Sequence, residues 1–242
     1  MTNKRIAVLV SGQARFSPDF DSFLDKLRPY SNVDWYFHFW RPDNDLVLHT
    51  LHTPVLPNKW KNPNNEWAFE KLSVYIPPHH NIRYLGFSDP NEVTVFNPRY
   101  HQTNRPKNVG LMFLGWKKVM AAVPDEYDLL IRTRLDVGVS ENFDLNTFDP
   151  ELLTASNNGW HGIDALSCDI INISGYEVMY KTCQLYDHIQ VMIDKSYTFH
   201  PETLLGLWVR DNNIAHVRGN FNNILRSRSD PNPTLNTDPR WN

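Results

Sequence analysis

An apolar run that passes directly into alternating charges is the feature that most constrains the fold of this 242-residue chain. Residues 129–131 read Leu-Leu-Ile, which is typical of a strand buried on both faces. Arg132, Arg134 and Asp136 follow at every second position, so they would share one face if the strand continued through them. Buried charges are costly unless they are paired or hold a ligand. The pattern therefore indicates either a site for a diphosphate, with or without a divalent metal, or an internal Arg–Asp pair that closes a sheet edge.

The segments around this run predict one α/β domain with a mainly parallel central sheet flanked by helices. A strand with a basic start is expected at residues 4–10 and a buried, aromatic-rich strand at 33–40, and Ser17, Pro18 and Asp19 open a helix between them. This β-α-β unit favours a parallel sheet with a right-handed crossover. The other expected elements are a helix near 66–72, a strand at 82–87, a long loop at 97–108, and helices at 110–122, 176–194 and from 200 to 208.

Composition excludes several classes of function. The net charge of −3 and the pI of about 6.3 come without a basic stripe, so nucleic acid is not an expected partner. The apolar run at residues 6–10 is too short for a signal-peptide core or a membrane span, which predicts a cytoplasmic protein without an integral membrane segment. Cys168 and Cys183 lack the spacing of metal ligands, so a reduced intracellular protein is the simpler interpretation.

The turn after the first strand reads Ser11-Gly12-Gln13-Ala14-Arg15 and lies where open α/β sheets bind ligands. Gly12 permits close approach of a ligand to the backbone, Gln13 can bind a base or ribose, and Arg15 can hold a phosphate. Neither the GxGxxG nor the GxxxxGK[ST] spacing is present, which disfavours a dinucleotide-binding fold and a P-loop. An ordinary strand-to-helix connection explains the same residues equally well.

Carboxylates in the second half are candidates for acid–base chemistry. Asp164 and Asp169 flank a short apolar pair near Trp160 and His161, where a half-buried carboxylate can act as a general base or simply cap a loop. Glu202 stands at the start of a helix, where the helix dipole alone would account for an acidic residue.

The remaining polar residues give weaker signals. Arg226 and Arg228 either clamp phosphates or lie on a solvated face. His38 is expected to be a hydrogen-bonded core residue, the pair His79-His80 is expected at the surface, and His216 could complete a metal shell. The sequence contains no G-x-S-x-G elbow and no HExxH motif.

Taken in order, these segments resemble small GT-A type glycosyltransferases of capsule and lipopolysaccharide synthesis. The resemblance lies in residues 11–15, 34–40 and 111–119, in Tyr127-Asp128, in Arg132-Thr133-Arg134-Leu135-Asp136 and in His200-Pro201-Glu202. Asp136 resembles the last carboxylate of the usual DxD motif, whereas Arg134 stands where that motif has Asp. Residues 41–108 match no part of the family.

The resemblance implies a GT-A (Rossmann-like) domain at residues 1–226, with a donor half at about 1–140 and an acceptor half at about 141–226. Residues 227–242, rich in Asp, Pro, Asn and Arg, are expected to form a loosely ordered tail. The implied reaction moves a sugar from a nucleoside-diphosphate sugar to a hydroxyl of a glycan acceptor. The residues expected to bind the nucleotide sugar are Ser11, Gly12, Gln13, Arg15, Arg132, Arg134 and Asp136.

The implied chemistry needs two further parts. Asp136 and the donor diphosphate are expected to hold Mn²⁺ or Mg²⁺. Direct inversion needs a carboxylate base at the acceptor oxygen, for which Asp164 is the first choice and Glu202 the second. Two alternatives remain: a carbohydrate- or nucleotide-binding protein without turnover, and a sugar nucleotidyltransferase. The latter requires a glycine-rich basic loop after the first strand, and residues 11–15 are too short and too poor in glycine for one.

Overall fold

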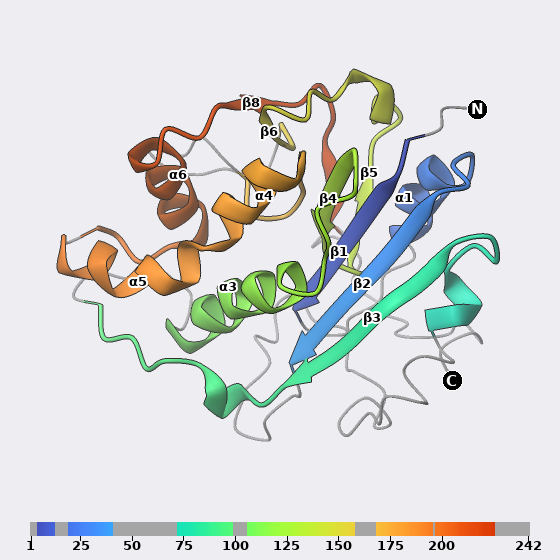
Figure 1. Cartoon of the computed structure of the whole chain (residues 1–242). Coiled ribbons are helices and arrows are strands. Elements are labelled where there is room, and N and C mark those ends of the chain that lie inside the picture. The colour runs from blue at the N-terminus through green and yellow to red at the C-terminus, as the bar shows by residue number, and fades with distance from the viewer. Residues whose placement is uncertain are drawn as a thin grey trace, which may run out of the picture.

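A seven-stranded sheet forms the centre of the protein in the computed structural model, which describes residues 4–12, 19–40, 72–98, 106–157, 168–195 and 197–225 (Figure 1). The strands lie in the order β3-β2-β1-β4-β7-β6-β8. Their bounds are β1 Ile6–Gly12, β2 Val33–Trp40, β3 Asn81–Ser88, β4 Leu129–Thr133, β6 Leu153–Ala155, β7 Asn172–Ser174 and β8 His216–Arg218.

The sheet is mainly parallel, which confirms the predicted α/β class. β3, β2, β1 and β4 are joined by parallel pairings. β7 runs antiparallel to both β4 and β6, and β8 is parallel to β6. Only β7 is therefore reversed in the sheet. Two short strands, β5 (Val137–Val139) and β9 (Asn223–Leu225), form a separate antiparallel pair.

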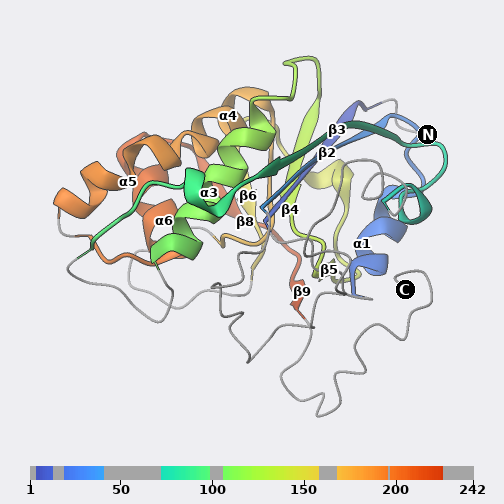
Figure 2. The same cartoon turned by 90° about the horizontal axis from the view of Figure 1, so that it is seen from below.

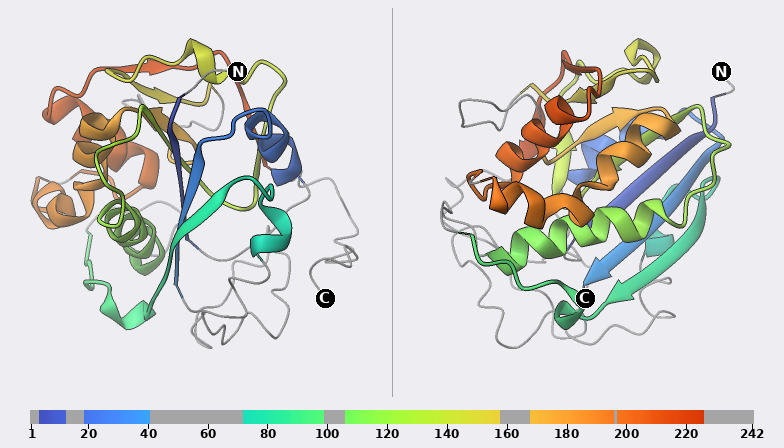
Figure 3. Two further views of the ribbon diagram at one scale, coloured as in Figure 1. Left: turned by 45° about the vertical axis from the view of Figure 1, so that its right-hand side comes forward. Right: turned by 60° about the vertical axis from the view of Figure 1, so that its left-hand side comes forward.

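Helices cover both faces of the sheet (Figures 2 and 3). Side chains alternate along β1, so Val8 and Val10 pack in one hydrophobic cluster with Phe23 of α1, whereas Leu9 packs in a second cluster with Phe113 of α3. Burial on both faces explains why the strand is continuously apolar. The helices are α1 Phe20–Leu27, α3 Pro106–Met120, α4 Tyr176–Cys183, α5 Leu185–Asp194 and α6 Pro201–Asp211, with short 3₁₀ turns η2 at Pro90–Glu92 and η3 at Leu145–Thr147.

The structure corrects several predicted boundaries. The first strand continues through Ser11 and Gly12, which were expected in a turn. α3 begins at Pro106, inside the expected loop, because proline suits the first turn of a helix. The helix expected at 176–194 divides at Gln184 into α4 and α5. A straight helix would place Cys183 and Leu185 on opposite sides, and the division allows both to be buried.

The connections between strands locate a topological switch point. From β1 the chain moves to β2 and β3 on one side, and it then returns through α3 to β4 on the other side of β1. In open α/β sheets, ligands bind outside the carboxyl ends of the strands at such a point. We call the residues at these ends and at the facing helix starts the carboxyl edge. α3 and α6 run back across the sheet before β4 and β8, so both helices start at this edge (Figure 3).

Candidate functional site

Ser11 and Gly12 end β1 at the switch point. Val10 pairs with Thr133, the last residue of β4, so Ser11 lies beside the start of the segment that contains Arg134. Gly12 has a φ of 122°, a conformation that residues with a Cβ rarely adopt. α3 packs closely here, because a Cβ at Gly115 would lie 3.3 Å from the Ser11 Cβ. Gln13 and Arg15, which were also expected to bind the donor, lie outside the described residues.

The strand does not continue through Arg134 and Asp136, because β4 ends at Thr133, so the condition under which the three charges would share one face is not met. Arg132 lies on the strand and is fully buried, with a relative exposure of 0%. Its Nε and Nη2 donate to the Oδ1 of Asn172 at 3.0 and 2.6 Å, and Nη2 also donates to the Asp169 carbonyl oxygen at 2.6 Å. Its guanidinium lies 3.6 Å from the centre of the Trp116 ring. Burial lowers the pKa of Arg132 to about 10. These contacts give Arg132 a positioning role and leave it no exposed surface for a phosphate.

Arg134 and Asp136 lie in the turn after β4 and bind each other. Arg134 Nε donates to Asp136 Oδ1 at 2.8 Å, and Nη2 donates to Oδ2 at 2.5 Å. The two side chains keep 29% and 17% of their surface exposed. Burial works against the charge of Arg134, but the Asp136 carboxylate outweighs it and raises the pKa of the guanidinium. The Arg–Asp pair that the sequence left open is therefore present, and it remains accessible to a ligand.

The metal expected at Asp136 would be held by this carboxylate and the donor diphosphate, and not by a group of protein side chains. Both carboxylate oxygens of Asp136 already accept hydrogen bonds from Arg134. Within the part of the chain that the structure describes, no group of three or more His, Cys, Asp or Glu side chains is placed to hold a metal. A cation at Asp136 would have to share the carboxylate oxygens with the Arg134 guanidinium.

A second group of ionisable residues converges on these arginines. Asp169 precedes β7, and Glu202 lies in the first turn of α6. Burial raises the pKa of Asp169, and the nearby Glu202 carboxylate raises it further, while Arg134, Arg132 and His200 act in the opposite direction. Two carboxylates that share an environment of this kind are a common arrangement for acid–base chemistry.

His200 contacts Glu202 directly. Its Nδ1 lies 2.6 Å from Glu202 Oε2, and the two side chains are only 15% and 14% exposed. The contact is an ion pair with poor angles, since neither atom makes a well-aligned hydrogen bond. The Glu202 carboxylate raises the pKa of His200. Glu202 is thus held in a polar cluster, and α6 has no side-chain cap at its first residue.

Buried polar atoms without a hydrogen-bond partner mark the same edge. Among the described residues there are five such side-chain atoms: Ser11 Oγ, Trp40 Nε1, Asn108 Oδ1, His200 Nδ1 and Glu202 Oε2. Ser11 and Trp40 end β1 and β2, and the other three belong to or precede the first turns of α3 and α6. Native proteins hydrogen-bond nearly all buried polar atoms. His200 Nδ1 and Glu202 Oε2 lie 2.6 Å from each other, so among these five the atoms with unused hydrogen-bonding capacity are those of Ser11, Trp40 and Asn108.

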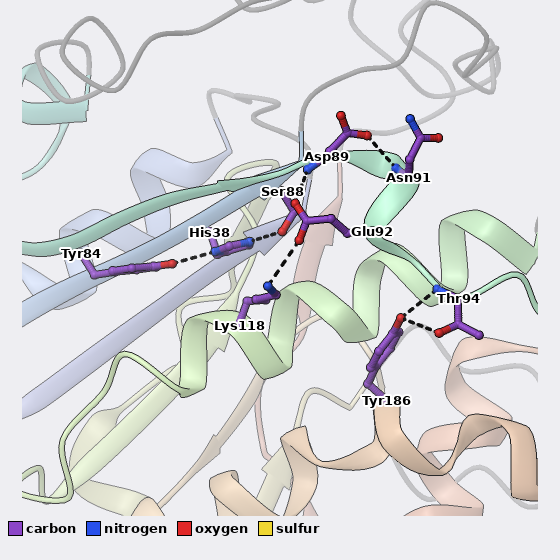
Figure 4. A network of polar contacts seen from close by, with 9 residues as sticks. All are labelled: His38, Tyr84, Ser88, Asp89, Asn91, Glu92, Thr94, Lys118 and Tyr186. Atoms are coloured by element: carbon purple, nitrogen blue, oxygen red, sulfur yellow. Dashed lines mark hydrogen bonds and ion pairs between the residues drawn. The ribbon is translucent and has the colours of Figure 1, made fainter.

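The histidines take structural roles. His38 is bonded at both ring nitrogens, to the Tyr84 hydroxyl at 3.0 Å and to Ser88 Oγ at 2.8 Å, which confirms the predicted core histidine (Figure 4). His80 is wrongly predicted at the surface, because it is buried and contacts Trp35 Nε1 and the Tyr30 carbonyl.

Two further groups of expected residues complete the comparison with the sequence. His216 lies on β8, and its Nδ1 is 3.2 Å from the carbonyl oxygen of Ile214. Asp164, Arg226 and Arg228 lie outside the described residues. Asp169 and His200 are the residues that sequence reasoning undervalued, and the only signal for them was their nearness to Asp164 and Glu202 along the chain.

Comparisons with known proteins add no family to this geometry. The chain matches no protein-family model, and no curated protein shows significant similarity to it. No helix among the described residues has the length and apolar character needed to cross a membrane.

Proposed function

We propose that the protein is a glycosyltransferase that moves a sugar from a nucleoside-diphosphate sugar to a hydroxyl of a glycan acceptor. One observation carries this proposal: Asp169, Glu202 and His200 lie at the same sheet edge as the partly exposed pair Arg134–Asp136. The reaction needs positive charge for the leaving diphosphate and a carboxylate for the acceptor hydroxyl. The carboxyl edge of the sheet offers both at the switch point.

The strand order supports a GT-A type of domain. β3-β2-β1-β4 is the order of a nucleotide-binding half-sheet. The single reversed strand, β7, lies between β4 and β6, so the sheet differs from that of a fully parallel dinucleotide-binding fold. The carboxylates Asp169 and Glu202 both come from the part of the chain after β4, which the resemblance assigns to the acceptor half.

Each residue has a distinct role in this proposal. Asp136 holds Arg134 in place through Nε and Nη2, and Arg134 binds the diphosphate through the guanidinium N–H groups that this pair does not use. Arg132 does not contact the donor and instead positions Asp169 through a hydrogen bond to its backbone carbonyl. Glu202 accepts the proton of the acceptor hydroxyl, and His200 lies against it. Asp164 stays a prediction for the same role.

Metal dependence is a separate proposal. The resemblance calls for Mn²⁺ or Mg²⁺ at Asp136, whereas the observed donor set favours charge neutralisation by Arg134. Turnover measured with EDTA and then with added Mn²⁺ separates the two. Full activity in EDTA would assign the charge neutralisation to the arginine, and activity that returns only with Mn²⁺ would assign it to a metal at Asp136.

A panel of nucleotide sugars tests the enzyme against its alternatives. The purified chain is incubated with UDP-, GDP- and CMP-sugars, and release of the free nucleotide is measured with and without simple sugar acceptors. Nucleotide release that Glu202→Gln abolishes supports a transferase. Tight binding without release would favour the non-catalytic carbohydrate- or nucleotide-binding protein. Pyrophosphate formed from a nucleoside triphosphate and a sugar phosphate would favour a nucleotidyltransferase.

A further inference from the structure

One face of β2 contains a polar residue whose hydrogen-bonding capacity the protein does not use. Tyr36, His38 and Trp40 point to the α3 side of the sheet, and the side chains of Tyr36 and His38 are hydrogen-bonded. Trp40 is the last residue of the strand and only 7% exposed. Its Nε1, which can only donate, has no acceptor among the residues that the structure describes. Of these three side chains, Trp40 is the one with a polar atom that makes no described hydrogen bond, and it lies at the carboxyl edge.

Ser11 lies beside Trp40 on the neighbouring strand. Ser11 pairs with His38 in the register of β1 and β2, so Trp40 is its diagonal neighbour on the same face. Ser11 Oγ is also buried and without a partner. A Cβ on Gly12 would lie 4.0 Å from Trp40 Nε1, so the indole nitrogen faces the backbone at the end of β1. Ser11 Oγ and Trp40 Nε1 therefore both lie near the backbone at the end of β1.

The chemistry of these atoms identifies the kind of ligand atom that suits them. An indole N–H can only donate, so its partner on a ligand must be an acceptor such as an oxygen. Arg134 follows β4, on the other side of β1 from β2, about two strand spacings or roughly 10 Å away. A diphosphate at Arg134 therefore leaves Ser11 and Trp40 within reach of the nucleoside to which it is attached.

We infer that Trp40 is a specificity-determining residue whose Nε1, together with Ser11 Oγ, binds an oxygen of the donor's nucleoside, either a ring carbonyl or a ribose hydroxyl. This inference rests on the proposed function. It adds a residue on β2 that the sequence did not indicate, because a tryptophan at the end of an apolar strand is ordinarily a core residue.

Two matched tryptophan substitutions test the inference. Trp40→Phe and Trp208→Phe remove the same atoms, but Trp208 Nε1 donates to the Lys181 carbonyl at 2.9 Å, whereas Trp40 Nε1 has no partner. Affinities for UDP, GDP, CDP and ADP are measured by calorimetry, and stability by urea unfolding. Trp40→Phe should weaken the preferred nucleotide about tenfold, and Trp208→Phe should leave the affinity unchanged. Trp208→Phe should be the less stable variant, because it alone loses an internal hydrogen bond.

Each outcome distinguishes the inference from the proposal beneath it. If the wild-type chain binds none of the four nucleotides, the proposed function fails and the role of Trp40 fails with it. If the wild-type chain binds one of them and Trp40→Phe binds it equally well, only the inference is overturned. Ser11→Ala provides the same test without a change in packing, and it decides the matter if Trp40→Phe does not fold. Loss of affinity in Ser11→Ala with unchanged stability supports the site.

Discussion

Buried polar groups at the two ends of β2 differ in whether they are hydrogen-bonded. At the amino end of β2, Asp34 accepts hydrogen bonds from Tyr127 at 2.7 Å and Asn81 at 2.8 Å, and its carboxylate lies 3.1 Å from Arg83. Tyr36 and Tyr127 share a further bond at 2.8 Å. At the carboxyl end of the same strand, Trp40 has a buried donor without an acceptor.

The difference separates groups that support the fold from groups that await a ligand. Burial of Asp34 raises its pKa, but the bonds from Tyr127, Asn81 and Arg83 outweigh burial and lower it, so the charge is stabilised internally. An unpartnered buried polar atom costs about 1–3 kcal/mol. A protein keeps such atoms together where function requires them, and here they gather at the switch point.

Of the predicted changes, loss of the Glu202 carboxylate should have the largest effect on turnover. Glu202→Gln should lower turnover by about two to four orders of magnitude, because the general base is lost, while nucleotide affinity stays within about twofold. Glu177→Gln is the matched control, since Glu177 also lies in the first turn of a helix but is exposed. Equal turnover of Glu202→Gln and wild type would remove Glu202 as the base and return Asp164 to first place.

Acid should weaken the fold through two histidines that the ligand site does not use. Burial lowers the pKa of both His38 and His80 from 6.5 to about 4. Between these two pH values the unfolded chain binds more protons than the folded chain, so acid favours unfolding. Their stabilisation is complete above pH 6.5 and is lost as the pH falls through 4. The loss should be about 3 kcal/mol for each histidine. Urea midpoints measured between pH 7.5 and 4 should fall, and a flat profile would contradict the prediction.

The two arginines should separate binding from stability. Arg134→Gln should weaken diphosphate binding by about 1.5–3 kcal/mol and leave the fold intact, because the side chain is partly exposed. Arg132→Gln should instead destabilise the fold, since it leaves the Asn172 and Asp169 oxygens without their donor. Calorimetry with UDP or the preferred nucleotide and urea unfolding test both variants. Identical behaviour of the two would show that the turn after β4 and the strand itself are not distinct in role.

The smallest effect is expected at the amino end. Asp34→Asn should lower the free energy of unfolding by about 1–3 kcal/mol, because a charged acceptor with several donors is lost. Nucleotide affinity should not change, since the substitution lies at the opposite end of the strand from Trp40. A drop in affinity measured by calorimetry would mean that the two ends are coupled through β2, and the comparison would no longer hold.

The fold was predictable because its strongest signals are local. The apolar runs at 6–10 and 129–131 are buried on both faces, and such burial imposes continuous hydrophobicity on each strand separately. The strand at 33–40 is buried throughout and is mainly aromatic. The reversed strand β7 was not predictable, because three residues carry too little pattern to show direction.

The candidate site was predictable only in part. Glu202, Arg134 and Ser11 were indicated by their positions after strands or at a helix start. The cluster of Asp169 with Glu202 was not, since the pairing of Arg132 with Asn172 across β4 and β7 is what brings Asp169 to the arginines.

The sequence by itself determined that apolar strands alternate with helices and that charges follow the strand at 129–133, because period and hydrophobicity are properties of single segments. The tertiary structure decided which of those charges is available. Arg132 and Arg134 look alike in sequence, yet one is enclosed by Trp116 and Asn172 and the other faces outward in a turn. The physical reason is that burial and pairing depend on neighbours from distant parts of the chain, which no local pattern specifies.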